Sequence, residues 1–251
     1  MVSQILDGKS KRLNSSDAVY LKLRTMIDNL ELFPGARITE TEIARLLSVS
    51  RTPIREALQR LQLEGQVDVI PKQGCFIRNI DIDLINKFYD VRVTLEIQTV
   101  ELACEFMSVE LLENMIAEWS PENLKDDYIH HIKTIRNKEE FFHLAIAAGS
   151  GNQILGRYLE DIHNNIRVVR WLGFPDMDSI RDTYEEHFEL CQIISSGNKR
   201  LARSSMKKHI QKSQKLSKKV TLQQLAENRN RYLKDKLRPL HETPNNTNCV
   251  G

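Results

Sequence analysis

The stretch TETEIARLLSVSRTPIREALQRLQLEG, residues 39–65, decides the fold of this chain and predicts two short helices joined by a tight turn. Thr39 and Glu42 form a capping-box pattern, which satisfies free amides at the start of the first helix. Ser-Val-Ser at 48–50 interrupts the helical period, and Ser50 is placed to cap the second helix. One apolar stripe is expected on each helix, formed by Ile43, Leu46 and Leu47 and then by Ile54, Leu58 and Leu61.

The second helix begins with polar side chains on the face opposite its apolar stripe. Arg51, Thr52 and Arg55 lie in its first two turns. Pro53 is tolerated there because a proline in the first turn removes no intrahelical hydrogen bond. Such a pair forms a helix-turn-helix, in which the second helix presents its first turn to the major groove of DNA. The alternative interpretation is an ordinary helical hairpin with a solvated face.

The flanking segments extend this motif to a winged helix-turn-helix. An amphipathic helix is expected over residues 17–30, and Phe-Pro-Gly at 33–35 ends it in a turn. Beyond residue 65 the apolar period changes from helical to alternating, which predicts a β-hairpin with Lys-Gln-Gly at 72–74 as its tip. Gly74 lets the backbone approach a phosphate or the minor groove closely.

These residues carry a family resemblance. The series PGARITETEIARLLSVSRTPIREALQRLQLEGQVDVIPKQGCFI, residues 34–77, resembles the DNA-binding domain of the GntR superfamily of bacterial transcription regulators. Thr41 stands where that family has a basic residue early in the first helix of the motif. The DNA contacts that the resemblance implies are Arg51, Thr52 and Arg55 in the recognition helix and Gln73 and Gly74 in the wing.

From residue 81 onward the pattern is helix after helix, so the chain is expected to be mainly α. Breaks rich in Gly, Pro and Ser separate helices at about 82–106, 109–118, 122–135, 137–148, 152–172, 177–195 and 199–219. The predicted organisation is a flexible arm at 1–16, the winged helix-turn-helix at 17–80, an all-α effector-binding and dimerisation domain at 81–220, and a partly disordered extension at 221–251.

Composition predicts a cytoplasmic protein. The net charge of +2 says little about partners, and the four scattered cysteines have no metal-ligand spacing, so they are interpreted as reduced thiols. No apolar run is long enough to span a membrane, and the first residues lack the apolar core of a signal peptide. No membrane partner is expected.

The helical region contains a possible metal site. Glu139 and His143 lie four residues apart on one helical face, while His187 and His209 lie on two helices that a short break should fold back antiparallel. Three imidazoles and a carboxylate would suit Zn²⁺, Ni²⁺, Mn²⁺ or Fe²⁺. The alternative is that these histidines are merely packed or exposed. The remaining histidines show no such spacing: His130, His131, His163 and His241.

The same region resembles the FCD domain of the FadR-like branch, whose helical bundle often holds a metal through an aspartate and three histidines. The implied ligands are Glu139, in place of the usual aspartate, and His143, His187 and His209. FYDVRVTLE at 88–96 places Arg92 where the branch has an arginine that meets the effector's carboxylate. The alternative for Arg92 is a buried partner for a carboxylate of the bundle.

Together these features predict a homodimeric regulator that binds a palindromic double-stranded operator and responds to a small organic acid. Two other interpretations stay open. One is a metal-free regulator that senses an acyl-type ligand through apolar contacts. The other is a metal-dependent enzyme, which is disfavoured because it would not need the Arg51–Arg55 face and because no general base besides the ligands stands out.

Overall fold

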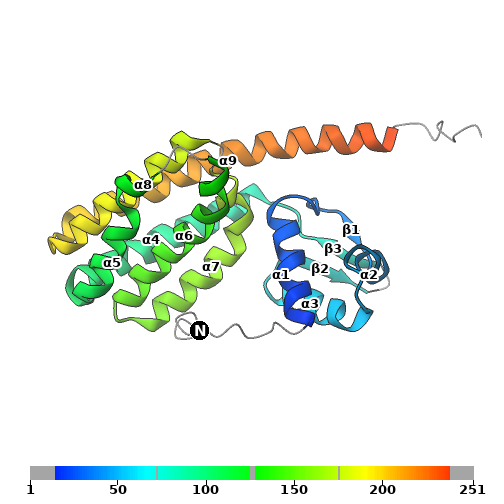
Figure 1. Cartoon of the computed structure of the whole chain (residues 1–251), viewed down its shortest axis with the longest axis horizontal. Helices are drawn as coiled ribbons and strands as arrows, with labels where there is room; N and C mark the ends of the chain where they lie inside the picture. The colour runs from blue at the N-terminus through cyan, green and yellow to red at the C-terminus, as the bar shows by residue number, and fades with distance from the viewer. Residues whose placement is uncertain (1–14, 72, 125–127, 175, 238–251) are drawn as a thin grey trace, which may run out of the picture.

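The structure is a computed structural model, and it describes residues 15–71, 73–124, 128–174 and 176–237. Figure 1 shows a small mixed domain followed by a larger domain made of helices, which confirms the predicted mainly α architecture. The predictions for the N-terminal arm, Lys72, His241 and the end of the chain lie outside the described residues.

The N-terminal domain is the predicted winged helix-turn-helix. Its elements are α1 (Ser15–Asp28), β1 (Arg37–Ile38), α2 (Glu40–Leu47), α3 (Arg51–Leu63), β2 (Val67–Ile70) and β3 (Gly74–Ile77). The capping box is present, since the Thr39 hydroxyl accepts from the Glu42 amide at 3.2 Å and the Glu42 carboxylate accepts from the Thr39 amide at 3.0 Å. Ser50 takes the N-cap position of α3, but its side chain makes no capping hydrogen bond.

The core of this domain lies between α1, α3 and the sheet. Ile54, Leu58 and Leu61 of α3 are buried, as their spacing predicts. The stripe predicted for α2 is wrong at Leu46, which is 60% exposed, because only Ile43 of that helix faces the interior fully. Ala44 and Leu47 also pack against the core of this domain but are only partly buried.

The sheet has one more strand than the sequence pattern predicts. Its order is β1-β3-β2, with all pairs antiparallel, and β1 is only two residues long. Gly74 starts β3 with φ of +116°, a backbone conformation that L side chains rarely adopt. The wing hairpin therefore requires glycine at this position.

The C-terminal domain is an all-α bundle. Its helices are α4 (Ile82–Phe106), α5 (Val109–Trp119), the 3₁₀ turn η2 (Pro121–Asn123), α6 (Tyr128–Gly149), α7 (Gln153–Trp171), α8 (Met177–Ser195) and α9 (Lys199–Leu237). The predicted helices 122–135 and 137–148 are not separate, because residues 128–149 form the single helix α6 without an interrupting Gly or Pro, and the start predicted at 122 falls in η2. Helix α9 continues beyond the predicted residue 219 and extends past the bundle (Figure 1).

Helix α4 is the central helix of the bundle, since α6, α7 and α9 all pack against it. Its N-terminus follows the wing after a short linker, so the same helix that begins at the junction with the DNA-binding domain runs through the bundle core. None of the described helices combines the length and the apolar character that crossing a membrane requires.

Candidate functional site

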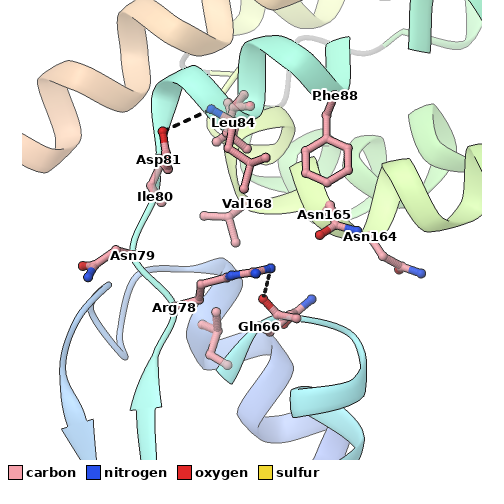
Figure 2. Close-up of a pocket in the computed structure, with 14 residues that line it drawn as sticks. Gln66, Arg78, Asn79, Ile80, Asp81, Leu84, Phe88, Asn164, Asn165 and Val168 are labelled. Carbon is pink, nitrogen blue, oxygen red and sulfur yellow. Dashed lines mark hydrogen bonds between the residues drawn. The ribbon is translucent and has the colours of Figure 1, made fainter. Parts of the chain in front are cut away.

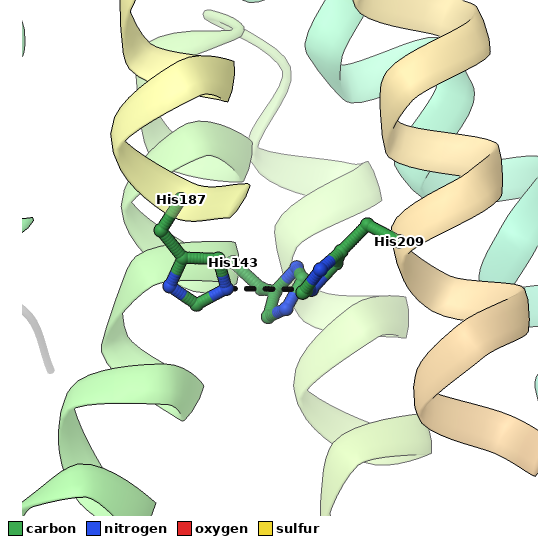
Figure 3. Close-up of side chains that lie close together, drawn as sticks. All are labelled: His143, His187 and His209. Atoms are coloured by element: carbon green, nitrogen blue, oxygen red, sulfur yellow. Dashed lines mark hydrogen bonds between the residues drawn. The ribbon is translucent and has the colours of Figure 1, made fainter. Parts of the chain in front are cut away.

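Three histidines meet in the interior of the bundle. His143 comes from α6, His187 from α8 and His209 from α9, and their rings point toward one another (Figure 3). One nitrogen from each ring lies within 4.8 Å of the others, and all three side chains are buried. The Nε2 atoms of His187 and His209 are 3.3 Å apart. Two nitrogens bound to one ion at about 2.0–2.1 Å would be separated by about 3 Å, so the cluster fits a metal ion.

Carboxylates on the outer side of the rings hold two of these imidazoles in place. The Nδ1 atom of His143 pairs with the Glu96 carboxylate, and Nδ1 of His209 lies 2.6 Å from Oε2 of Glu186. Such contacts turn Nε2 of each ring inward and increase its basicity, as at most histidine metal sites. The Nε2 atom of His143 is buried and makes no hydrogen bond of good geometry among the described residues, although Oε1 of Glu139 lies 3.1 Å away. A bound metal would coordinate this nitrogen.

The protonation states of His187 and His209 also suit a metal. Burial lowers the pKa of His187 well below its ordinary value, and the positive charge that its neighbours His209 and His143 can carry lowers it further. Burial likewise lowers the pKa of His209, against the opposing effect of Glu186. Both rings are therefore neutral at neutral pH, and neutral imidazole is the form that binds metals.

Glu139 lies beside the cluster rather than within the group of three histidines. Its Oε1 atom is 3.1 Å from Nε2 of His143 and 3.7 Å from Nη2 of Arg92, and its Oε2 atom pairs with Arg170. Burial alone would raise the pKa of Glu139, but Arg170, His143 and Arg92 hold it well below the usual value. Glu139 is thus an ionised carboxylate near the metal-binding nitrogens, and its role as a ligand stays a prediction.

Arg92 is fully buried next to these groups. Its Nε donates to Oε1 of Glu96 at 2.6 Å, while its Nη1 and Nη2 have no hydrogen-bond partner among the described residues. The structure therefore shows the pairing with a bundle carboxylate that was the alternative for this residue. It also leaves both terminal nitrogens available to a second acceptor, which an effector carboxylate could supply.

Two buried residues of α7 complete the site, although sequence reasoning gave them no role. His163 places Nε2 3.2 Å from Oε1 of Glu96, and burial lowers the pKa of His163 to about 3. Arg170 pairs with Glu139 and is also fully buried. The sequence does indicate that His163 and Arg170 belong together, because a spacing of seven residues places both on one face of a helix.

A small pocket opens beside His209. Its volume is about 40 Å³, enough for a few water molecules or for the carboxylate end of a small acid. The polar groups lining it include Glu139, Arg170, Thr183, Glu186, His209 and Lys212. The pocket is therefore lined by part of the site, with Arg92, His143 and His187 outside its lining.

The predicted DNA-contact residues lie at the start of α3 and in the wing of the N-terminal domain. Arg51 and Thr52 open α3 and Arg55 follows one turn later, and all three are exposed. Gln73 is exposed in the turn that leads into the wing strand, directly before Gly74. These positions are those expected of a recognition helix and wing.

The two domains meet at a junction around α1 and α7. Figure 2 shows the linker from Arg78 to Asp81 entering α4, with Asn164 and Val168 of α7 beside it. Val168 packs against the core of the winged helix-turn-helix. Arg24 of α1 donates from Nη2 to Oδ1 of Asn164 at 3.2 Å, so both apolar and polar contacts tie the domains together.

Comparisons with known proteins agree with these two domains. Residues 15–77 match the family described as bacterial regulatory proteins, gntR family, and residues 87–212 match the FCD domain. The chain therefore belongs to the GntR family of transcription regulators, and it carries an FCD domain. It is a DNA-binding regulator and not an enzyme.

Particular relatives support this assignment. The Nta operon transcriptional regulator of Aminobacter aminovorans is 31% identical over 179 residues, which cover 71% of this chain and 83% of that protein. An HTH-type transcriptional regulator in an unstable DNA locus of Streptomyces ambofaciens is 30% identical over 205 residues, or 79% and 83% of the two chains. The solved structure of E. coli McbR/YncC has the same fold, with a TM-score of 0.65, 22% identity and coverage of 82% and 98%.

Proposed function

We propose that this regulator binds a divalent transition-metal ion and a small carboxylate effector in its FCD domain, and that the effector changes operator affinity. The observation that carries the proposal is the convergence of His143, His187 and His209. Zn²⁺, Ni²⁺, Mn²⁺ and Fe²⁺ all accept imidazole ligands, and the donor set does not choose among them.

The charges around the histidines support an acidic effector. When bound, the metal supplies a Lewis-acidic centre that attracts a carboxylate. The terminal nitrogens of Arg92 make no hydrogen bond among the described residues, although Nη2 lies 3.7 Å from Oε1 of Glu139. Arg170 likewise has Nε and Nη1 without hydrogen-bond partners among those residues. If Glu139 turns to the metal, Arg170 loses its present partner and becomes available to the acid.

Calorimetry with a panel of small carboxylic acids on the metal-loaded protein tests this proposal. One acid should bind the parent, and its affinity should fall about tenfold or more in Arg92→Lys and in His187→Ala, because lysine lacks the bidentate fork and alanine removes a ligand. Arg157→Ala, an exposed change elsewhere in the bundle, serves as the control.

An acid that binds all four proteins equally would place the effector site elsewhere. A protein that takes up no metal but binds an acyl-type ligand through apolar contacts would favour the metal-free alternative.

A chain of hydrogen bonds offers a route from this site to the recognition helix. Glu64, the C-cap of α3, accepts from the Tyr20 hydroxyl at 2.8 and 2.9 Å. The same hydroxyl accepts from Nη1 of Arg24 at 2.7 Å, and Nη2 of Arg24 donates to Asn164 across the junction at 3.2 Å. The end of the recognition helix is thereby tied to α7.

From α7 the chain continues to the site. The Arg167 Nη2 atom donates to Asn164 at 2.7 Å and to Oε1 of Glu140 at 2.9 Å. Glu140 directly follows Glu139 in α6, so a displacement of this turn of the helix would move both carboxylates. We infer that effector binding reaches the DNA-binding domain through these contacts, to the extent that the effector prefers one arrangement of them.

The protein is also proposed to act as a homodimer on a palindromic operator. One winged helix-turn-helix buries little DNA surface, so two symmetric copies are expected on two half-sites. Sedimentation velocity at micromolar concentration should give twice the chain mass, both free and on DNA. A monomer under both conditions would contradict this expectation.

A further inference from the structure

The recognition-helix arginine Arg55 is held by a carboxylate of the preceding helix. Arg55 donates from Nε to Oε1 of Glu40 and from Nη2 to Oε2, both at 2.9 Å. Glu40 is the first residue of α2, so the contact joins the start of α2 to the second turn of α3. Two parallel hydrogen bonds fix the plane of the guanidinium as well as its position.

This pairing leaves part of Arg55 free. A guanidinium has five N–H groups, and Glu40 takes one from Nε and one from Nη2. The remaining groups include one on Nη1 and one on Nη2 that lie side by side at the far end of the side chain. That pair matches the O6 and N7 acceptors of guanine in the major groove.

The Glu40 carboxylate weakens the general electrostatic attraction between the domain and DNA. Its side chain is 32% exposed, and the hydrogen bond from Arg55 lowers its pKa, so Glu40 is ionised. A negative charge beside the recognition helix repels phosphates and weakens binding to any sequence. Its presence at this position therefore reduces overall affinity, while the fixed guanidinium can discriminate between bases.

We propose that Glu40 is a specificity-determining residue, which positions the Arg55 guanidinium to read a guanine and so exchanges general DNA affinity for base discrimination. This inference rests on the proposed role of Arg55 in DNA contact. Arg51 is close enough for its charge to act on Glu40 as well, but Arg55 alone makes both hydrogen bonds.

The experiment begins with a pool of random-sequence duplexes from which the full-length parent selects its preferred site. Affinities are then measured at one salt concentration for that site, for single-base variants and for an unrelated duplex. Four proteins are compared with the parent: Glu40→Gln, Arg55→Ala, the double variant and Glu56→Gln. Glu56→Gln removes the same charge from an exposed position directly after Arg55. Circular dichroism checks that each variant remains folded.

The expected result is that Glu40→Gln loses about tenfold of discrimination at one base pair in each half-site and binds the unrelated duplex at least as tightly as the parent. Arg55→Ala should lose discrimination at the same base pair, and the double variant should lose no more. Glu56→Gln should keep the parent's base preference.

Two results would overturn the proposal in distinguishable ways. If Arg55→Ala loses the preference and Glu40→Gln keeps it, Arg55 reads DNA without help from Glu40. If Arg55→Ala itself binds and discriminates like the parent, the assigned role of Arg55 in DNA contact is wrong.

Discussion

Replacing Arg51 or Arg55 with alanine is expected to weaken operator binding about thirtyfold or more while the bundle remains folded. Both side chains are exposed at the start of α3, where a recognition helix meets base edges. A bidentate contact between arginine and a base contributes about 1–3 kcal/mol, and each subunit of a dimer would lose it. Fluorescence anisotropy with a selected duplex at fixed salt measures the change.

The control must separate this contact from a general loss of positive charge. Arg157→Ala removes the same charge from an exposed position on α7 of the bundle. It should leave operator affinity within about twofold of the parent, since screened charges far from DNA contribute little. Parent-like affinity in both recognition-helix variants would refute the assignment of α3 to the major groove.

Metal loading is expected to raise the melting temperature of the parent by about 5–10 °C and to leave His187→Ala unchanged. A ligand at a hundred times its dissociation constant stabilises the native state by about 2.7 kcal/mol. For a chain of this size each kcal/mol shifts the melting temperature by about 2–4 °C. Differential scanning calorimetry with Zn²⁺, Ni²⁺ or Mn²⁺, together with elemental analysis, measures the effect.

A second buried histidine provides the matched comparison. His163 contacts Glu96 but does not belong to the cluster of three histidines. The melting temperature of His163→Asn should therefore still rise on metal loading, even if this variant is less stable than the parent without metal. If none of the three ions raises the melting temperature of the parent, the buried imidazoles do not form the proposed metal site.

Much of the N-terminal domain could be predicted because its determinants are local. The capping box at Thr39 and Glu42 and the glycine of the wing act within a few residues, and the structure contains both. Strand β1 could not be predicted because two residues show no alternation, and its pairing with β3 joins residues far apart in the chain. The exposure of Leu46 depends on how α2 packs, which its own period does not reveal.

The candidate metal site was partly predictable for a similar reason. Helical spacing brought Glu139 and His143 to one face, and the short break after α8 brought His187 opposite His209. The partners that orient these rings or pair with the carboxylates lie on other helices. Glu96 is on α4 and Arg170 on α7, and only helix packing brings them together.

The central claim is that the bundle site controls the recognition helices through the domain junction. The most direct test measures operator affinity with and without the acid identified by calorimetry, in the metal-loaded parent and in Arg24→Ala, which lacks the link between Tyr20 and Asn164. The acid should change the parent's operator affinity about five- to a hundredfold. Arg24→Ala should still bind the acid and the DNA, but its operator affinities with and without the acid should be nearly equal. An acid that binds the parent without changing its operator affinity would contradict the account.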